Sequence, residues 1–186
     1  GQIFLEINGG LKEVNVRSPH EAQNLGISTV YQEITLCPNL TVAENMFIGR
    51  GNYRTVNWRS MKKKAAEILE KLNIPARAAQ QLGTCSIAVQ QMVAIARAVD
   101  MDCKVLILDE PTSSLDEQEV EKLLSLMREL KSRGVGIIFI THFLDQMYGI
   151  SDRVTVLRNG ELAVTPSLAT LLLECCDHMN ALVDVL

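Results

Sequence analysis

Two adjacent carboxylates at the end of an apolar run are the residues in this sequence best suited to chemistry. Val105 to Leu108 is wholly apolar, and Asp109 and Glu110 follow it directly. Such a run predicts a buried strand of a parallel sheet, and open α/β sheets bind ligands at the carboxyl edge of their strands. Neighbouring side chains of a strand point in opposite directions, so one acid could hold a metal ion while the other faces a water. On its own the pair could also be two exposed acids at a strand end.

The residues after these acids alternate between helix and strand patterns. Asp116 is expected to cap a long amphipathic helix that ends near residues 133–134. Residues 135–141 are again apolar and predict a second buried strand, which His142 follows. Further on, Asn159-Gly160 is typical of a two-residue hairpin turn between short strands.

The residues before the acids predict two strands and a helical insertion. Residues 1–7 and residues 27–31 have strand patterns, and the second strand ends at Gln32. Between the two strands, Ser18-Pro19-His20-Glu21 is a capping box that opens a short helix. After Gln32 the pattern becomes helical, and helices are predicted to start after Thr41, Asn57 and Ser86.

The sequence therefore predicts a single α/β domain over residues 1–186. Residues 1–32 and 104–164 form its core, residues 33–103 form a helical subdomain, and residues 165–186 form a C-terminal helix.

Composition excludes several other classes of protein. The net charge is −4 with acids and bases interspersed, and Lys62-Lys63-Lys64 is the one basic cluster, so a nucleic-acid partner is not expected. No apolar stretch reaches the ~20 residues that a membrane-spanning helix needs. The five cysteines contain no C-x-x-C pair, which favours reduced thiols over a metal site or disulfides.

A series of motifs resembles, in order, those of the ATP-binding cassette (ABC) ATPases, and the resemblance runs from about residue 1 to residue 164. It implies a partial P-loop NTPase (RecA-like) sheet core with an inserted helical subdomain. The matching segments are Val30–Glu33 (the Q-loop), Cys85–Ala98 (the signature segment and its helix), Leu108–Pro111 (Walker B), Ser113–Asp116 (the D-loop) and Thr141-His142 (the switch histidine).

The resemblance implies a role in ATP hydrolysis for four residues. Asp109 would help to hold Mg²⁺, and Gln32 would reach the Mg²⁺ site and couple it to a transmembrane partner. Glu110 would act as general base for the attacking water, and His142 would contact the γ-phosphate and orient that water. Phosphoryl transfer depends mostly on such positioning and charge stabilisation. Taken alone, Gln32 could be an ordinary surface residue and His142 a structural one.

The signature segment would act on a nucleotide held by another subunit. Ser86, Ala88 and the helix N-terminus behind them would bind its γ-phosphate, since free N–H groups and the helix dipole favour an anion there. Asp116 would belong to the D-loop as well as capping its helix. Ser86 could also be a plain helix cap.

Two departures from the family pattern matter. Residues 85–89 are Cys-Ser-Ile-Ala-Val where the common pattern is L-S-G-G-Q, so the serine stays but both glycines are replaced. The phosphate loop G-x-x-x-x-G-K-[ST] does not occur in the 186 residues. Backbone N–H groups and a lysine that cradle phosphates are therefore lacking, and we expect a chain truncated upstream of Gln32 that binds ATP poorly by itself.

The altered signature and three further segments resemble the ATPases of bacterial ribose, galactose and galactofuranose importers. The segments are residues 42–50, 141–146 and 151–160. The resemblance implies the first of two cassettes in one chain, with ATP and Mg²⁺ as cofactors. It also implies a membrane permease and a second nucleotide-binding domain as partners, a periplasmic sugar-binding protein as an indirect partner, and a place on the cytoplasmic face of the inner membrane.

Two other functions stay open. One is a non-transport ABC ATPase, although the basic linkers and coiled-coil arms of such proteins are not seen here. The other is a degenerate, non-catalytic ABC-like interaction module. The presence of both Glu110 and His142 favours a working enzyme over that module.

Overall fold

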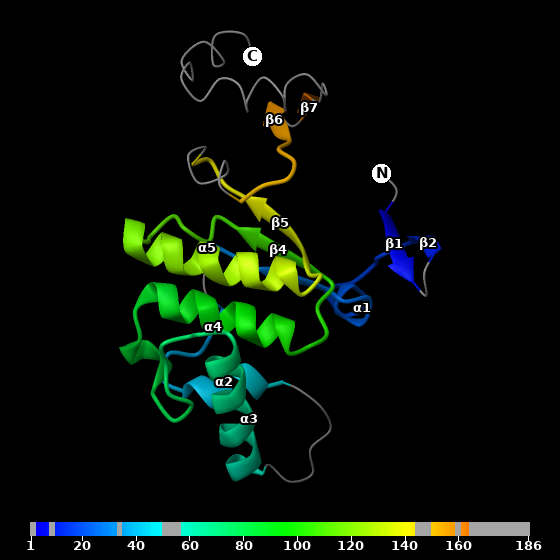
Figure 1. Ribbon diagram of the computed structural model, residues 1–186. Coiled ribbons are helices and arrows are strands. Elements are labelled where there is room, and N and C mark those ends of the chain that lie inside the picture. Colours follow the sequence, from blue (N-terminus) through cyan, green and yellow to red (C-terminus); the bar gives the residue numbers. More distant parts are fainter. Residues whose placement is uncertain are drawn as a thin grey trace. The chain divides into compact units, whose positions relative to one another are not determined.

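The computed structural model describes residues 3–7, 10–32, 35–49, 57–143, 150–158 and 161–163 (Figure 1). The chain divides into two compact units, Gly1–Thr141 and His142–Leu186. The division into a core, a helical subdomain and a C-terminal helix that the sequence suggested stays a prediction, and the predicted helix over residues 165–186 lies outside the described residues.

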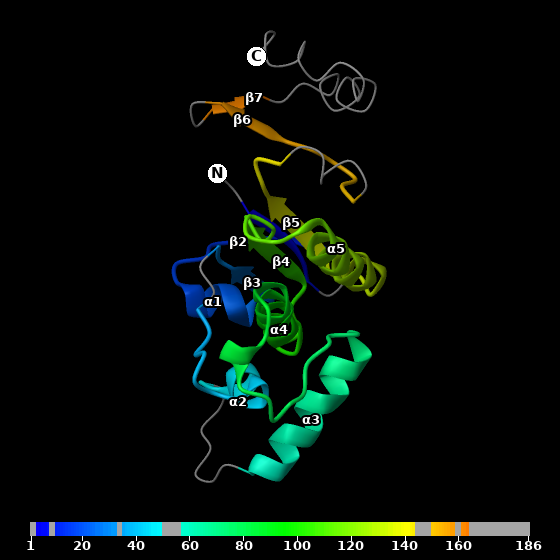
Figure 2. The same ribbon diagram turned by 90° about the vertical axis from the view of Figure 1, so that its left-hand side faces the viewer.

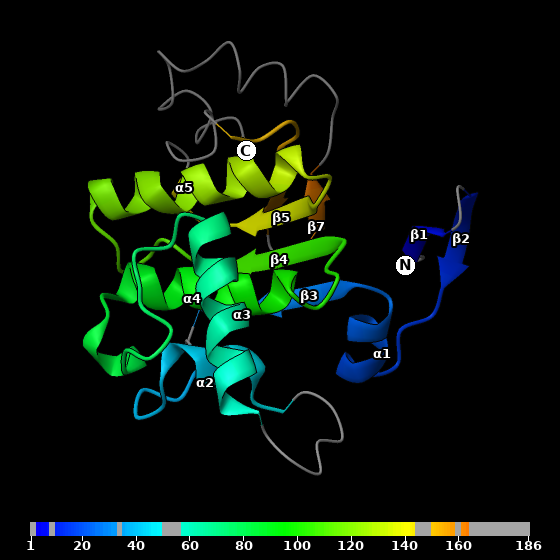
Figure 3. The same ribbon diagram turned by 60° about the horizontal axis from the view of Figure 1, so that its bottom comes forward.

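A three-stranded parallel sheet forms the centre of the first unit. Its strands β3 (Ile27–Val30), β4 (Val105–Asp109) and β5 (Gly136–Ile140) lie in the order β3-β4-β5 (Figure 3). The wholly apolar run therefore forms a strand of a parallel sheet, as predicted, and this strand is the central one of the three. At the carboxyl edge of the sheet Asp109 pairs with Ile140.

Two helices, α4 (Ile87–Val99) and α5 (Glu117–Ser132), cover one face of this sheet (Figure 2). Leu106 and Leu108 of β4 are fully buried on that face. Val30, which pairs with Leu108, is buried beside them. Burying each of these side chains contributes about 2 kcal/mol of hydrophobic stabilisation, so this face anchors the carboxyl edge of β4.

The prediction that residues 135–141 form a buried strand is wrong for half of its side chains. Ile137 and Phe139 are half-buried, whereas Ile138 and Ile140 are 51% and 47% exposed. Because successive side chains of a strand point to opposite faces, only one set lies on the face covered by helices. An apolar sequence alone does not tell how many faces of a strand are covered.

The inserted segment is helical, as predicted, and its helices contact one another (Figure 1). Within the described ranges, no helix is long and apolar enough to span a membrane. Besides α4, the segment contains α2 (Val42–Phe47), α3 (Trp58–Lys71) and the 3₁₀ turn η1 (Leu82–Thr84).

Side-chain caps start the helices where the sequence predicted them. Asn57 and Ser86 accept hydrogen bonds from backbone N–H groups in the first turns of α3 and α4. Thr41 and Glu44 form a complete capping box at α2. The Thr41 backbone N–H, and then its hydroxyl, lower the pKa of Glu44 below its ordinary 4.5. Such caps satisfy N–H groups that have no partner inside the helix.

The capping box predicted at Ser18 is only half formed. Its hydroxyl accepts from the Glu21 N–H and opens α1 (Pro19–Asn24). The Glu21 carboxylate, however, accepts from the Arg17 N–H at 2.8 Å instead of closing back on Ser18. Gly26, which has a φ of 81°, follows this helix and lets the chain turn into β3.

Among the described residues, each unit also contains an antiparallel pair of strands. In the first unit β1 (Ile3–Ile7) pairs with β2 (Gly10–Val14), where the sequence predicted only the first strand. In the second unit β6 (Val156–Arg158) pairs with β7 (Glu161–Ala163). The second pair confirms the predicted hairpin, whose turn residues lie outside the described ranges.

Candidate functional site

The two acids after the central strand have different backbone conformations. Asp109 is the last residue of β4 and is half-buried. Glu110 has a φ of 44°, in the left-handed region. Among the described residues, the other non-glycine residues with positive φ are Asn73 and Asp102, which are types that tolerate this region. A glutamate is not such a type, so the structure around Glu110 imposes its conformation.

The contacts of the Glu110 backbone show what holds it there. Its N–H donates to the carbonyl of Ile140 at 2.9 Å, and its own carbonyl accepts from the Ser113 N–H at 3.3 Å. Pro111 and Thr112, which follow it, are buried. The strand alternation expected for the acid pair therefore stops at Asp109, and a turn sets the direction of the Glu110 side chain.

Gln32 meets Glu110 at this edge. The Nε2 of Gln32 donates to Oε2 of Glu110 at 3.2 Å, between residues 78 positions apart in the chain. β3 ends two residues before Gln32, and β4 ends directly before Glu110. The parallel order of these neighbouring strands thus brings Gln32, Asp109 and Glu110 to one edge of the sheet. Their roles in hydrolysis stay predictions.

Oxygen donors at this edge suit a hard divalent cation. The Asp109 carboxylate and the oxygens of Glu110 and Gln32 are the ligand type that Mg²⁺ prefers. The described residues contain no group of three His, Cys, Asp or Glu side chains arranged to hold a metal. Mg²⁺ at phosphate sites usually takes one or two carboxylates, with waters and phosphate oxygens completing the shell. Asp109 fits that pattern as a partial ligand.

The signature and D-loop candidates are both helix caps. Ser86 precedes α4, and its Oγ accepts from the Val89 N–H at 3.4 Å. Asp116 precedes α5, where its carboxylate accepts from the Glu119 N–H at 2.8 Å. Ala88 is buried in the first turn of α4. The capping roles that the sequence allowed are present, and contact with a nucleotide stays a prediction.

His142 belongs to the second unit, two residues after the end of β5. Its ring lies 4.1 Å from that of Phe143, between centroids, with the planes tilted by 37°. Its expected contact with a γ-phosphate stays a prediction.

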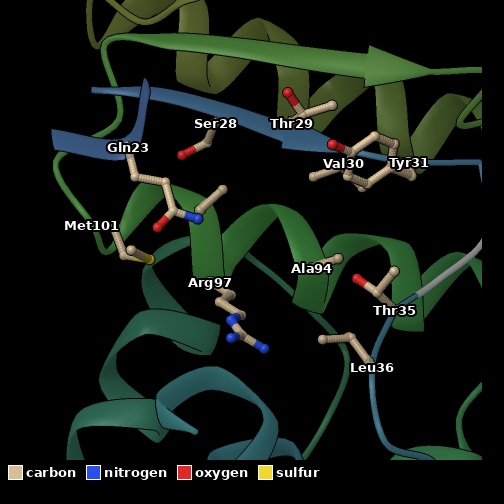
Figure 4. Close-up of a pocket in the computed structure, with 11 residues that line it drawn as sticks. Gln23, Ser28, Thr29, Val30, Tyr31, Thr35, Leu36, Ala94, Arg97 and Met101 are labelled. Atoms are coloured by element: carbon tan, nitrogen blue, oxygen red, sulfur yellow. The ribbon is translucent and has the colours of Figure 1, made fainter. Parts of the chain in front are cut away.

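A pocket of about 240 Å³ lies between β3 and α4 (Figure 4). It is lined by β3 and by Tyr31 on one side, and by Ala94 and Arg97 of α4 on the other. Sequence reasoning missed it. Tyr31, an aromatic residue that is 56% exposed directly before Gln32, belongs to the wall, but exposure cannot be known from sequence.

Comparison with known proteins gives a family match. Residues 1–113 match the family model described as ABC transporter. Among curated proteins, a galactofuranose transporter ATP-binding protein of Escherichia coli (strain K12) is 52% identical over 162 residues, which cover 86% of this chain and 32% of that protein. A fructose import ATP-binding protein of Bifidobacterium longum is 49% identical over 145 residues, covering 76% of this chain and 28% of the relative. The chain therefore spans about a third of the length of these relatives.

Solved structures give the same fold. A nucleotide-free ATP-binding cassette from an ABC transporter superposes with a TM-score of 0.69 at 25% identity, over 82% of this chain and 65% of that one. An ADP-bound cassette of an ABC transporter gives a TM-score of 0.75 at 22% identity, over 92% of this chain and 74% of that one. The α/β fold with an inserted helical segment, predicted as a partial P-loop NTPase core, is confirmed.

Proposed function

Because the chain belongs to the ABC transporter family, we propose that it binds and hydrolyses ATP to drive sugar import. The observation that carries the proposal is the contact between Gln32 and Glu110 beside Asp109, at the carboxyl edge of a parallel sheet. The names of the relatives, which import galactofuranose, fructose or ribose, support a sugar as the cargo.

The geometry at the sheet edge supports Glu110 as the general base for the attacking water. Its turn takes the carboxylate out of the strand, and Gln32 holds one of its oxygens. The Glu110 carboxylate would accept a proton from the attacking water. Asp109 would hold Mg²⁺, which when bound neutralises phosphate charge and draws the phosphoryl group into line. Gln32 would orient Glu110, and its position would depend on whether Mg²⁺ and nucleotide are bound at the site.

Ser86 and the start of α4 would bind the γ-phosphate of a nucleotide held by a second cassette. α4 is 13 residues long, and its first-turn N–H groups and dipole favour an anion. Ser86 is exposed, so its hydroxyl is accessible to a second subunit. His142 would contact a γ-phosphate from the segment after β5.

The pocket between β3 and α4, whose wall includes Tyr31, is the proposed contact for a membrane permease. Tyr31 and Leu36 give it apolar wall, and Gln23 and Thr35 give it polar groups (Figure 4). A permease segment bound there would contact Tyr31, the residue directly before Gln32, so its movement could be coupled to the site. The protein would then work at the cytoplasmic face of the membrane, with a periplasmic sugar-binding protein as an indirect partner.

The experiment is the Glu110→Gln substitution in the assembled importer, since the chain itself contains no G-x-x-x-x-G-K-[ST] segment. Turnover should be abolished while ATP stays bound, because the amide keeps the shape but cannot take a proton. The matched control is Glu67→Gln, an exposed glutamate on α3 paired only loosely with Lys63, at 3.9 Å. Turnover within about tenfold of the unsubstituted protein, a loss under roughly 1.4 kcal/mol, would overturn the role of Glu110.

A further inference from the structure

Two segments far apart in the sequence are joined by a run of backbone hydrogen bonds. We call residues 37–43 and 78–83, taken together, the seam. Its bonds are all 2.9 Å long, and Thr41 and Gln81 also form an isolated antiparallel bridge. The bonds run from the N–H groups of Val42, Ala43, Leu82 and Gly83 to the carbonyls of Gln80, Ala78, Leu40 and Pro38, respectively.

Asn45 holds the first half of the seam in shape. It is fully buried, yet both ends of its amide are satisfied. Its Oδ1 accepts from the Cys37 N–H at 2.7 Å, and its Nδ2 donates to the carbonyls of Cys37 and Thr41 at 2.9 and 3.0 Å. A buried amide that bonds only to backbone fixes the path of that backbone, because breaking any of these bonds leaves a buried polar group without a partner.

Gly83 permits the close approach of the second half. A Cβ at this position would lie 3.1 Å from the Pro38 carbonyl oxygen and 3.2 Å from the Pro38 Cβ. Next to it, Leu82 is fully buried. A side chain at Gly83 would therefore push residues 81–83 away from Pro38 by a few tenths of an ångström.

The seam connects two parts of the proposed site. One half begins five residues after Gln32. The other half ends three residues before Ser86, and the intervening Cys85 donates its N–H to the carbonyl of Leu82 at 2.9 Å. The segment that leads into Ser86 therefore has its backbone fixed on the segment that leaves Gln32.

Arg97 makes a second connection between the same elements. Its guanidinium, on α4, donates to the carbonyls of Asn45 and Ile48 at 3.2 and 3.1 Å. Helix α4, which begins directly after Ser86, is thus tied to the same residue that shapes the seam. Ser86 is held by η1 on one side and by α4 on the other.

We propose that Asn45 and Gly83 are positioning residues for Ser86, which keep its hydroxyl and the N-terminus of α4 in fixed register with the segment that follows Gln32. Both residues act through the seam. The proposal rests on the proposed function, since it assigns Ser86 a phosphate to meet.

The first test is amide hydrogen exchange in the assembled importer. Gly83→Ala and Asn45→Ala should each speed exchange at the Leu82 and Gly83 N–H groups by about tenfold, because the seam bonds open more often. The matched control is Gly10→Ala, where an added Cβ meets nothing within 4 Å. Unchanged exchange in both seam variants would overturn the proposal, and Gly83→Ala keeps the test decisive if Asn45→Ala does not fold.

The second test is a double-mutant cycle with Ser86→Ala on ATP turnover. Ser86→Ala and Gly83→Ala should each lower kcat by about tenfold with little change in the KM for ATP, and the double variant should lose about tenfold rather than a hundredfold. A merely structural role predicts additive losses, which would overturn the inference. Turnover that survives Glu110→Gln would instead overturn the proposed function, and the exchange result would still report on the seam.

Discussion

Relieving the backbone strain at Glu110 should make the protein more stable while removing the proposed base. Glu110 has a φ of 44°, a conformation that glycine adopts freely and that is unfavourable for glutamate or glutamine. We therefore expect Glu110→Gly to be more stable than Glu110→Gln, although the glutamine keeps the side-chain volume. Comparing these two variants cancels the loss of the carboxylate, which both share.

The size of the effect follows from three terms, one that favours glycine and two that favour glutamine. A residue with a Cβ loses roughly 1–2 kcal/mol in the left-handed region. Glycine loses about 0.5–1 kcal/mol of this advantage, because an unfolded chain with glycine has more conformations to give up on folding. Glutamine can also keep an exposed hydrogen bond to Gln32, which adds only a few tenths of a kcal/mol in water. Subtracting both of these terms leaves glycine more stable than glutamine by roughly 0.5 kcal/mol.

Urea unfolding monitored by circular dichroism measures this difference, and Lys122 supplies the control. Lys122 is exposed in α5, where glycine costs about 1 kcal/mol relative to good helix formers. Lys122→Gly should therefore be less stable than Lys122→Gln, which is the opposite sign to position 110. If glycine is the less stable variant at both positions, the strain at Glu110 is not real and the reasoning fails.

Three further predictions concern the core, the helix cap and the thiols. Leu106→Ala, at a fully buried position, should cost roughly 3 kcal/mol of unfolding free energy, whereas Ile138→Ala should cost about 1 kcal/mol or less in the same urea titration. The backbone N–H and hydroxyl of Thr41 lower the pKa of Glu44 in the folded state, so the stabilisation from its carboxylate is present above pH 4.5 and is lost as pH falls through the folded pKa. Glu44→Gln should therefore weaken the dependence of the unfolding free energy on pH in this acidic range, and an unchanged dependence would contradict the reasoning. Burial raises the pKa of the Cys103 thiol, so a thiol reagent at mildly alkaline pH should label exposed Cys37 in the native protein and Cys103 only after urea unfolding, as peptide mass spectrometry would show.

Much of the fold follows from local patterns in the sequence. The capping residues Thr41, Asn57 and Ser86 start helices where they were predicted, because a cap acts over only three residues. The central strand was also predictable, since Val105 to Leu108 is apolar on both faces. The sequence does not show which faces of β5 are covered. Ile138 is exposed, and its exposure depends on which of the other elements reach its face of the strand.

The candidate site also has a part that the sequence predicts and a part that it does not. The meeting of Gln32 and Glu110 could be expected from motif order, because both follow strands that prove to be neighbours. The seam could not, since Asn45 and Gly83 carry no chemistry of their own. Their importance comes from bonds between segments about 40 residues apart, and only coordinates show such pairing.

The left-handed turn at Glu110 also explains how an acid can follow a buried strand at low cost. Strand alternation would place residue 110 on the same face as Leu106 and Leu108, which is the face covered by helices. A carboxylate buried there without partners would cost several kcal/mol, more than the 1–2 kcal/mol of the strained backbone. The left-handed conformation ends the strand alternation before Glu110, whose carboxylate accepts from Gln32, while Asp109 remains the last residue of the strand. The two acids therefore reach different surroundings because the chain leaves the strand between them.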